Sequence, residues 1–170
     1  MGEHYYSLNE YYKRKYNKKV YKLSINGGMT CPNRDGTLGN KGCIFCSKGG
    51  SGEFAASSSV SITEQLNSAI EKVSKKTKDN AYIAYFQPFT NTYADSDYLR
   101  KIYYEAIKPE FIVGLSVATR PDCLEDDKLK LLAEINKIKP VSVELGLQTI
   151  HEKTAKYIRR GYTLDSMMTP

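Results

Sequence analysis

Residues 111–123 read FIVGLSVATRPDC, an apolar, β-rich run that ends in a polar turn. Two similar runs flank it, AYIAYF at residues 81–86 and VSVEL at residues 141–145, and the three begin thirty residues apart. A fourth run of this kind comes earlier in the chain. Short β-rich runs separated by longer segments are typical of strands joined by crossover connections. The sequence therefore predicts strands at Tyr21–Ile25, Ala81–Phe86, Phe111–Val117 and Val141–Leu145.

The segments after these strands have the period of amphipathic helices. Ser61 and Glu64 form the pattern of a capping box before the first apolar stripe, and Asp95 is the expected N-cap of the second. Strands that alternate with helices indicate an α/β fold with a parallel sheet, here with about four βα units. The expected stripes are Ile62–Val73, Leu99–Ile107 and Leu129–Leu132–Ile135, followed by a helix at about His151–Arg159.

Composition excludes several classes of protein. Hydrophobic residues make up 41% of the 170 residues and charged residues 26%, which is the balance of a folded globular domain and excludes disordered and collagen-like chains. No apolar run approaches the ~18 residues that a membrane-spanning helix needs. The N-terminal MGEHYY lacks the hydrophobic segment of a signal peptide, so we expect a cytoplasmic protein and no membrane partner.

The positive charge of the chain is concentrated near its N-terminus. The net charge is +6, and the stretch from Tyr11 to Arg34 carries seven basic residues and no acid. Tyrosines interleave these cations, a composition that suits RNA or single-stranded nucleic acid. The alternative is a solvated helix face whose tyrosines pack on a barrel wall. Residues 1–20 are accordingly expected to form a basic, Tyr-rich N-terminal extension.

Three of the four cysteines fall within sixteen residues. In a reduced compartment, clustered cysteines indicate metal or redox chemistry instead of disulfides. A structural zinc site normally takes four protein ligands, and the only histidines, His4 and His151, are expected at the surface. An iron–sulfur cluster is also held by thiolates, and three of them would leave one iron of a four-iron cluster open to a small molecule. The clustered residues are Cys31, Cys43 and Cys46; the fourth cysteine, Cys123, is expected at a helix start.

Four segments carry a specific resemblance. They are residues 23–36 (LSINGGMTCPNRDG), 85–93 (YFQPFTNTY), 116–123 (SVATRPDC) and 143–151 (VELGLQTIH). In this order they resemble the YhcC/YtqA-like (MnmL-type) group of the radical S-adenosylmethionine (radical SAM) superfamily, a group related to the catalytic subunit of the elongator complex. The common cysteine spacing of the superfamily is C-x₃-C-x₂-C, whereas here eleven residues separate Cys31 from Cys43.

The resemblance implies a partial (βα) parallel barrel of radical SAM type. It implies a [4Fe–4S] cluster on Cys31, Cys43 and Cys46, with S-adenosyl-L-methionine bound to the open iron. Reductive cleavage of that cofactor gives methionine and a 5′-deoxyadenosyl radical, which abstracts hydrogen from the substrate. A reductant such as flavodoxin or ferredoxin is implied as the source of the electron.

The same resemblance implies cofactor contacts outside the cysteines. Phe45, directly before the last cysteine, matches the aromatic residue near the adenine. Gln148 and Arg160 match a glutamine and an arginine that contact the cofactor. Gln87 begins the segment QPFT, which stands where related enzymes have a glycine-rich motif for the methionine amino group.

Two further residues are candidates for catalysis. Glu144 lies in the fourth predicted strand, where its carboxylate would orient a ligand; the alternative is a buried acid paired with a lysine. Arg120 follows the third strand and is suited to a substrate or cofactor carboxylate. Its alternative role is a structural ion pair with Asp122.

The leading interpretation is a radical SAM enzyme that acts on the wobble uridine of tRNA. The resemblance implies conversion of a carboxymethylaminomethyl group to an aminomethyl group. The alternatives are a zinc-stabilised RNA-binding module without catalysis, or an inactive truncated fragment. Because a barrel of this type has more than four βα units, residues 21–170 are expected to form an incomplete barrel at the N-terminal end of a larger enzyme.

Overall fold

The computed structural model describes residues 5–52, 55–76 and 79–168. Its centre is one four-stranded sheet in which every neighbouring pair of strands is parallel and the spatial order is the chain order. A parallel order of this kind requires each connection to cross back over the sheet, and helices make those crossings. The strands are β1 (Tyr21–Ile25), β2 (Tyr82–Phe86), β3 (Ile112–Thr119) and β4 (Val141–Leu145).

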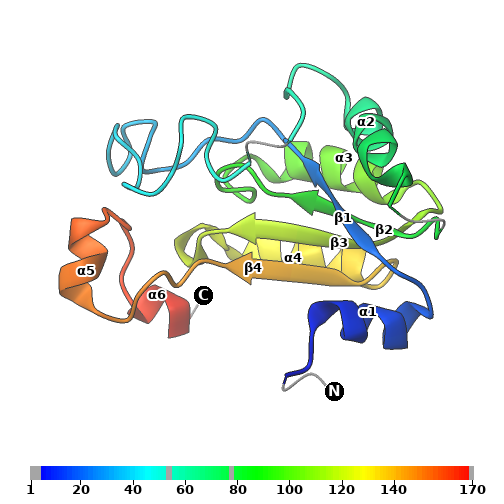
Figure 1. Cartoon of the computed structure of the whole chain (residues 1–170). Coiled ribbons are helices and arrows are strands. Elements are labelled where there is room, and N and C mark those ends of the chain that lie inside the picture. The colour runs from blue at the N-terminus through cyan, green and yellow to red at the C-terminus, as the bar shows by residue number, and fades with distance from the viewer. Residues whose placement is uncertain (1–4, 53–54, 77–78, 169–170) are drawn as a thin grey trace.

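The helices begin where the sequence places their caps. Ser61 and Glu64 form a complete capping box at the start of α2, and the Asp95 side chain accepts a hydrogen bond from the Asp97 backbone N–H at the start of α3. Three helices cover one face of the sheet (Figure 1). The helices are α1 (Leu8–Tyr16), α2 (Ile62–Ser74), α3 (Ser96–Ile107), η1 (Pro121–Cys123), α4 (Asp126–Asn136), α5 (Glu152–Tyr157) and α6 (Asp165–Met168).

The hydrophobic core lies between the sheet and α2, α3 and α4, on what we call the outer face of the sheet. Leu23, Phe86 and Leu115 point to this side and are at most 1% exposed. The Phe86 ring packs edge-on against the Tyr103 ring of α3, with 5.0 Å between centroids. This apolar layer is the main source of stability of the described fold.

The opposite face, which we call the inner face, is polar and carries α1. Side chains on a strand alternate between faces, so Lys22, Tyr85, Ser116 and Glu144 share this side. The Tyr16 hydroxyl donates to the Val113 carbonyl at 3.3 Å, which holds the C-terminal end of α1 against β3. The helix therefore lies across the sheet from α2 and α3 (Figure 1).

The predicted strands and α/β class are confirmed: β1 and β4 have the predicted boundaries, and those of β2 and β3 differ by one or two residues. The third apolar stripe needs a correction. Leu129 is 38% exposed, and Leu131 takes its place beside Leu132 and Ile135 in the core. The helix that follows β4 ends at Tyr157, before the expected end, because Arg159 adopts a left-handed backbone with φ of 57°.

Within the described residues, no helix combines the length and the apolar character that crossing a membrane would need.

The described tyrosines of the N-terminal extension fall into two groups. Tyr12 is 8% exposed and packs at the inner face, whereas Tyr6 and Tyr11 are exposed. The expectation for the first four residues of the extension, and for His4 among them, lies outside the described residues.

Candidate functional site

The loops that follow the four strands meet at the carboxyl edge of the sheet. The loop that contains the three cysteines extends from the end of β1, and α5 faces it across this edge (Figure 1). The Ile44 backbone N–H donates to the Ile158 carbonyl at 3.2 Å, which joins the two segments directly. Functional groups gather at this edge in parallel α/β folds.

A cavity of about 380 Å³ opens among these loops. All three cysteines of the loop line it, and with them five of the six other predicted site residues. Loops that follow parallel strands share one edge of the sheet, and these groups accordingly line one cavity. The predicted residues in the cavity wall are Cys31, Cys43, Cys46, Phe45, Arg120, Glu144, Gln148 and Arg160.

The protonation of Cys43 and that of Cys46 depend on each other. Cys46 hydrogen-bonds to Cys43 and lowers the pKa of the Cys43 thiol to about 6, and the Asn33 amide and the nearby Arg120 and Arg34 act in the same direction. The same hydrogen bond and burial raise the pKa of Cys46. Cys43 is therefore the first thiolate of the pair, and a thiolate is the form that binds metal.

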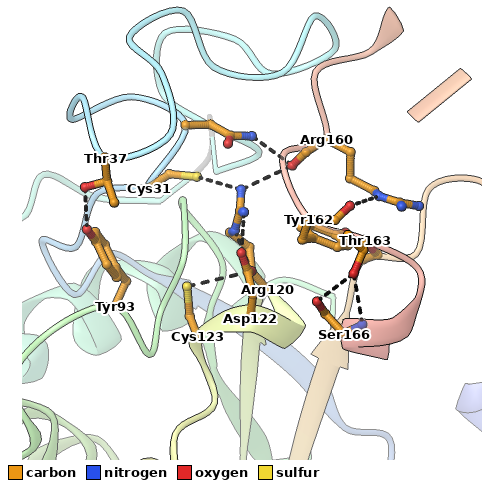
Figure 2. Close-up of polar contacts among 12 residues, drawn as sticks. Cys31, Thr37, Tyr93, Arg120, Asp122, Cys123, Arg160, Tyr162, Thr163 and Ser166 are labelled. Carbon is orange, nitrogen blue, oxygen red and sulfur yellow. Dashed lines mark hydrogen bonds and ion pairs between the residues drawn. The ribbon is translucent and has the colours of Figure 1, made fainter. Parts of the chain in front are cut away.

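Arg120 lies beside the first cysteine. Its guanidinium forms a two-pronged ion pair with Asp122, with N–O distances of 2.9 and 2.6 Å, and its Nη1 is 3.9 Å from the Cys31 Sγ (Figure 2). The arginine is 7% exposed. The structural pairing with Asp122 is thus present, and it places a cation next to the Cys31 sulfur.

Arg160 is 1% exposed and closes the other side of the cavity. Its guanidinium donates to the carbonyls of Thr149 at 2.6 Å and Tyr162 at 2.9 Å, so it holds the segment after β4 against the segment after α5. The Tyr162 ring lies between Arg120 and Arg160, 4.9 Å from each guanidinium carbon (Figure 2). These two cations and one ring form a rigid wall.

Glu144 belongs to the inner face of the sheet and reaches the cavity from below the loops. It accepts hydrogen bonds from Lys22 and Ser116, and Lys22 also lies 4.4 Å from the centre of the Tyr85 ring. Burial acts to raise the pKa of Glu144, but the hydrogen bonds from Lys22 and Ser116 outweigh it and leave the pKa lowered. The carboxylate is charged, and the lysine pairing named as its alternative role is present.

The three remaining predicted residues differ in their placement. The Phe45 ring is 53% exposed in the cavity wall and is free to stack on a planar ligand. Gln148 is exposed, with a left-handed φ of 64°. Gln87 is not part of the described cavity wall: its side chain accepts from the Ser24 hydroxyl at 2.8 Å and donates to the Ser51 carbonyl.

Asn33 and Arg34 contribute to the site but were not among the predicted site residues. Asn33 is 6% exposed and its amide nitrogen is 3.2 Å from the Cys43 Sγ. Arg34 donates to the carbonyls of Cys46 and Ser47 and lies 5.4 Å from the centre of the Phe89 ring. Both stand directly after Cys31-Pro32, so proximity to the first cysteine was the available signal.

The donor set fits a thiolate-bound cluster. Three thiols line one cavity with cations nearby that offset negative charge. Within residues 5–52, 55–76 and 79–168, no three His, Cys, Asp or Glu side chains converge closely enough to enclose a single metal ion. Cys123 lies outside the described cavity wall, in the turn η1, and burial raises its pKa to about 12.

Comparison with known proteins identifies relatives of the whole described fold. Residues 35–169 match the family described as the Radical SAM superfamily. The chain is 45% identical to protein YtqA of Bacillus subtilis over 158 residues, covering 93% of this chain and 49% of YtqA. It is 45% identical to protein YhcC of Escherichia coli K12 over 150 residues, covering 88% of this chain and 47% of YhcC. The chain thus spans about half the length of these curated relatives.

A solved structure shares the arrangement of strands and helices. The archaeal Methanocaldococcus infernus Elp3 with an N-terminal deletion superimposes with a TM-score of 0.56, at 15% sequence identity, over 89% of this chain and 34% of that protein. At this identity the match concerns the arrangement of strands and helices alone. It agrees with the parallel α/β sheet described above.

Proposed function

The chain belongs to the radical SAM superfamily, and from this premise we propose that it holds a [4Fe–4S] cluster on Cys31, Cys43 and Cys46. The observation that carries the proposal is that the three thiols and three of the four predicted cofactor contacts, Phe45, Gln148 and Arg160, line one cavity. Bound there, the reduced cluster supplies the electron for cleavage of S-adenosylmethionine. A one-electron donor such as flavodoxin or ferredoxin is the proposed source of that electron.

The residues of the chain would bind and orient the cofactor. The exposed Phe45 ring offers a stacking surface for the adenine, and the exposed Gln148 side chain, which lines the same cavity, offers amide hydrogen bonds. Arg160 already donates to backbone carbonyls and to the Glu152 carboxylate, so its role in this proposal is to hold the cavity wall in place. Glu144 is charged and would attract a cationic group of the ligand.

Anaerobic reconstitution with iron and sulfide tests the cluster. The wild-type chain should develop a broad absorbance near ~400 nm, as iron–sulfur thiolate chromophores do, and produce 5′-deoxyadenosine from S-adenosylmethionine when reduced. Cys43→Ala should lose both signals. Cys123→Ala is the matched control, because Cys123 lies outside the described cavity wall, and it should retain both. A colourless wild-type protein with one bound zinc would overturn the proposal in favour of a zinc-stabilised module.

The proposed substrate is the wobble uridine of tRNA, with conversion of a carboxymethylaminomethyl group to an aminomethyl group. The resemblance of the four sequence segments supports this choice. Surface charge supports it as well. The cations Lys41, Lys156 and Arg159 line a second pocket of about 600 Å³. This pocket adjoins the cysteine cavity, with which it shares Gly42 and Tyr162. Cations at this position suit the phosphates that flank a reacting nucleotide. Nucleoside profiling of tRNA from a deletion strain tests the reaction.

The basic helix α1 is a second candidate RNA surface, but it lies toward the other edge of the sheet, where the strands begin (Figure 1). Several of its cations already have partners: Arg14 pairs with Glu10, and Lys15 lies 5.5 Å from the rings of Tyr11 and Tyr16. We therefore propose that the cations beside the cysteine cavity contribute more to RNA affinity than those of α1.

Three sets of alanine substitutions separate these surfaces. Replacing Lys41, Lys156 and Arg159 should weaken tRNA binding and reduce the slope of log K against log salt by about 2, since each phosphate contact contributes roughly 0.7–0.9. Replacing Lys13, Lys18 and Lys19 tests the N-terminal extension. The matched control replaces Lys72, Lys101 and Lys130, exposed residues on the three outer-face helices, and should leave the slope nearly unchanged. Equal effects of the first and third sets would contradict the proposed surface.

A further inference from the structure

The side-chain amide of Asn33 contacts three acceptors at the edge of the cysteine cavity. Its nitrogen is 3.2 Å from the Cys43 Sγ and 2.9 Å from the backbone carbonyl oxygens of both Arg159 and Arg160. One amide group thus joins a predicted cluster ligand to the segment after α5. Asn33 is 6% exposed, so these contacts do not compete with bulk water.

The position of this amide is fixed from several directions. The Gly42 backbone N–H donates to the Asn33 carbonyl at 2.8 Å, which folds the loop back just before Cys43. Gly161 packs directly on the side chain: a Cβ at this position would lie 2.2 Å from the Asn33 Oδ1, and the φ of Gly161 is +84°. Only glycine permits this approach. Asn33 is therefore held in one orientation, with its donor side toward the sulfur.

Donors to the ligand sulfurs are few. The Arg120 Nη1 reaches the Cys31 Sγ at 3.9 Å, near the limit for a hydrogen bond to sulfur. Among the described residues, Asn33 is the one neutral side-chain amide that donates to any of the three sulfurs. A hydrogen bond to a ligand sulfur stabilises the more negative, reduced state of a cluster and so raises its potential.

We propose that Asn33 is a positioning residue for Cys43, which holds the thiolate in place and raises the reduction potential of the cluster through its N–H···S hydrogen bond. This inference rests on the proposed function, because it concerns the same three sulfurs. It adds a role for a residue outside the ligand set, and it predicts a change in potential that a purely structural residue would not produce.

The variant Asn33→Asp tests it. The shape of the side chain is retained, but the donor becomes a carboxylate oxygen that faces a thiolate and two carbonyls. We expect a more negative midpoint potential in an EPR-monitored titration, and loss of iron to a chelator about 10-fold faster than in the wild type. Asn40→Asp is the matched control: it makes the same change in the same loop, at an exposed residue, and should shift neither value.

The outcomes separate the two proposals. A wild-type chain that binds no cluster overturns the proposed function and this inference with it. A wild-type cluster whose potential is unchanged in Asn33→Asp, relative to Asn40→Asp, overturns the inference alone. The unmodified protein supplies an independent measurement if Asn33→Asp does not fold: with ¹⁵N-labelled asparagine, hyperfine spectroscopy of the reduced cluster should detect a weakly coupled nitrogen. Absence of that coupling would also overturn the inference.

Discussion

The two faces of the sheet differ in chemistry and in what holds them together. On the outer face, Leu23 and Phe86 are almost completely buried under helices. On the inner face, Lys22, Tyr85 and Glu144 form a half-buried polar group below the cysteine cavity. The two sets alternate along the same strands, one residue apart. A single sheet therefore separates an apolar layer that stabilises the fold from a polar layer that reaches the site.

This difference has an energetic consequence. Burial of apolar area is non-directional and scales with area, so the outer face tolerates rearrangement of individual side chains at a cost in free energy. The inner face depends on specific pairs with defined geometry, which contribute little to stability when they are partly exposed. Substitutions in the outer-face core should therefore lower the free energy of unfolding strongly, whereas substitutions of the inner-face pairs should change it little.

The largest expected effect is a difference in the free energy of unfolding between alanine variants of two phenylalanines. Phe86 is 0% exposed and packs on Tyr103, whereas Phe45 is 53% exposed in the cavity wall. Phe86→Ala should lower the free energy of unfolding by about 3–5 kcal/mol. Phe45→Ala makes the same chemical change and should alter it by less than about 0.5 kcal/mol. Urea denaturation of both variants measures this, and similar losses in the two would contradict the assignment of stability to the outer face.

The outer face was also the part that the sequence predicted well. Its strands were found from β-rich runs, and α2 and α3 from apolar spacing and caps, because these signals are local and periodic. The exception is Leu129, which fits a helical stripe with Leu132 and Ile135 but lies on the exposed side. Packing decides which side of α4 faces the sheet, and Leu131, two residues after Leu129, is the one that lies in the core.

The grouping of the candidate site residues follows from the sequence in part. The three cysteines, Phe45 and Gln148 meet around one cavity because loops after parallel strands share an edge. That topology follows from the order of strands, which the sequence supplies. The hydrogen-bond partners of each site residue do not follow from this topology. Contacts such as the Asn33 amide with the carbonyls of Arg159 and Arg160 join residues more than a hundred positions apart, and no local pattern encodes them.

A smaller effect is expected at the start of α2, which covers the outer face. The Ser61 hydroxyl accepts from the Glu64 backbone N–H, and the Glu64 carboxylate accepts from the Ser61 backbone N–H at 2.9 Å. Ser61→Ala should cost about 1 kcal/mol of stability through loss of the N-cap. Ser74→Ala, at the last residue of the same helix, is the control and should be neutral or slightly stabilising because alanine favours helix. Thermal unfolding of both variants shows whether the stability of the fold depends on the N-cap of α2.

The smallest expected effect lies on the inner face and depends on pH. The pKa of Glu144 is lowered, since the hydrogen bonds from Lys22 and Ser116 outweigh burial. An acid with a lowered pKa contributes stability that is complete above its ordinary value of 4.5 and is lost as the pH falls through the lower, folded-state value. Lys22→Met should therefore destabilise the chain by at most about 1 kcal/mol at pH 7.

The pH dependence distinguishes this charge pair from simple packing. At acidic pH, as Glu144 becomes protonated, its attraction to Lys22 is lost, so Lys22→Met and the wild type should differ less there than at pH 7. Lys101→Met, at an exposed position on α3, is the control and should show no such convergence. A deficit of equal size at both pH values would mean that the Lys22 ammonium acts through the face of the Tyr85 ring, 4.4 Å away, and not through Glu144. The inner face would then depend on a cation–ring contact in place of an ion pair.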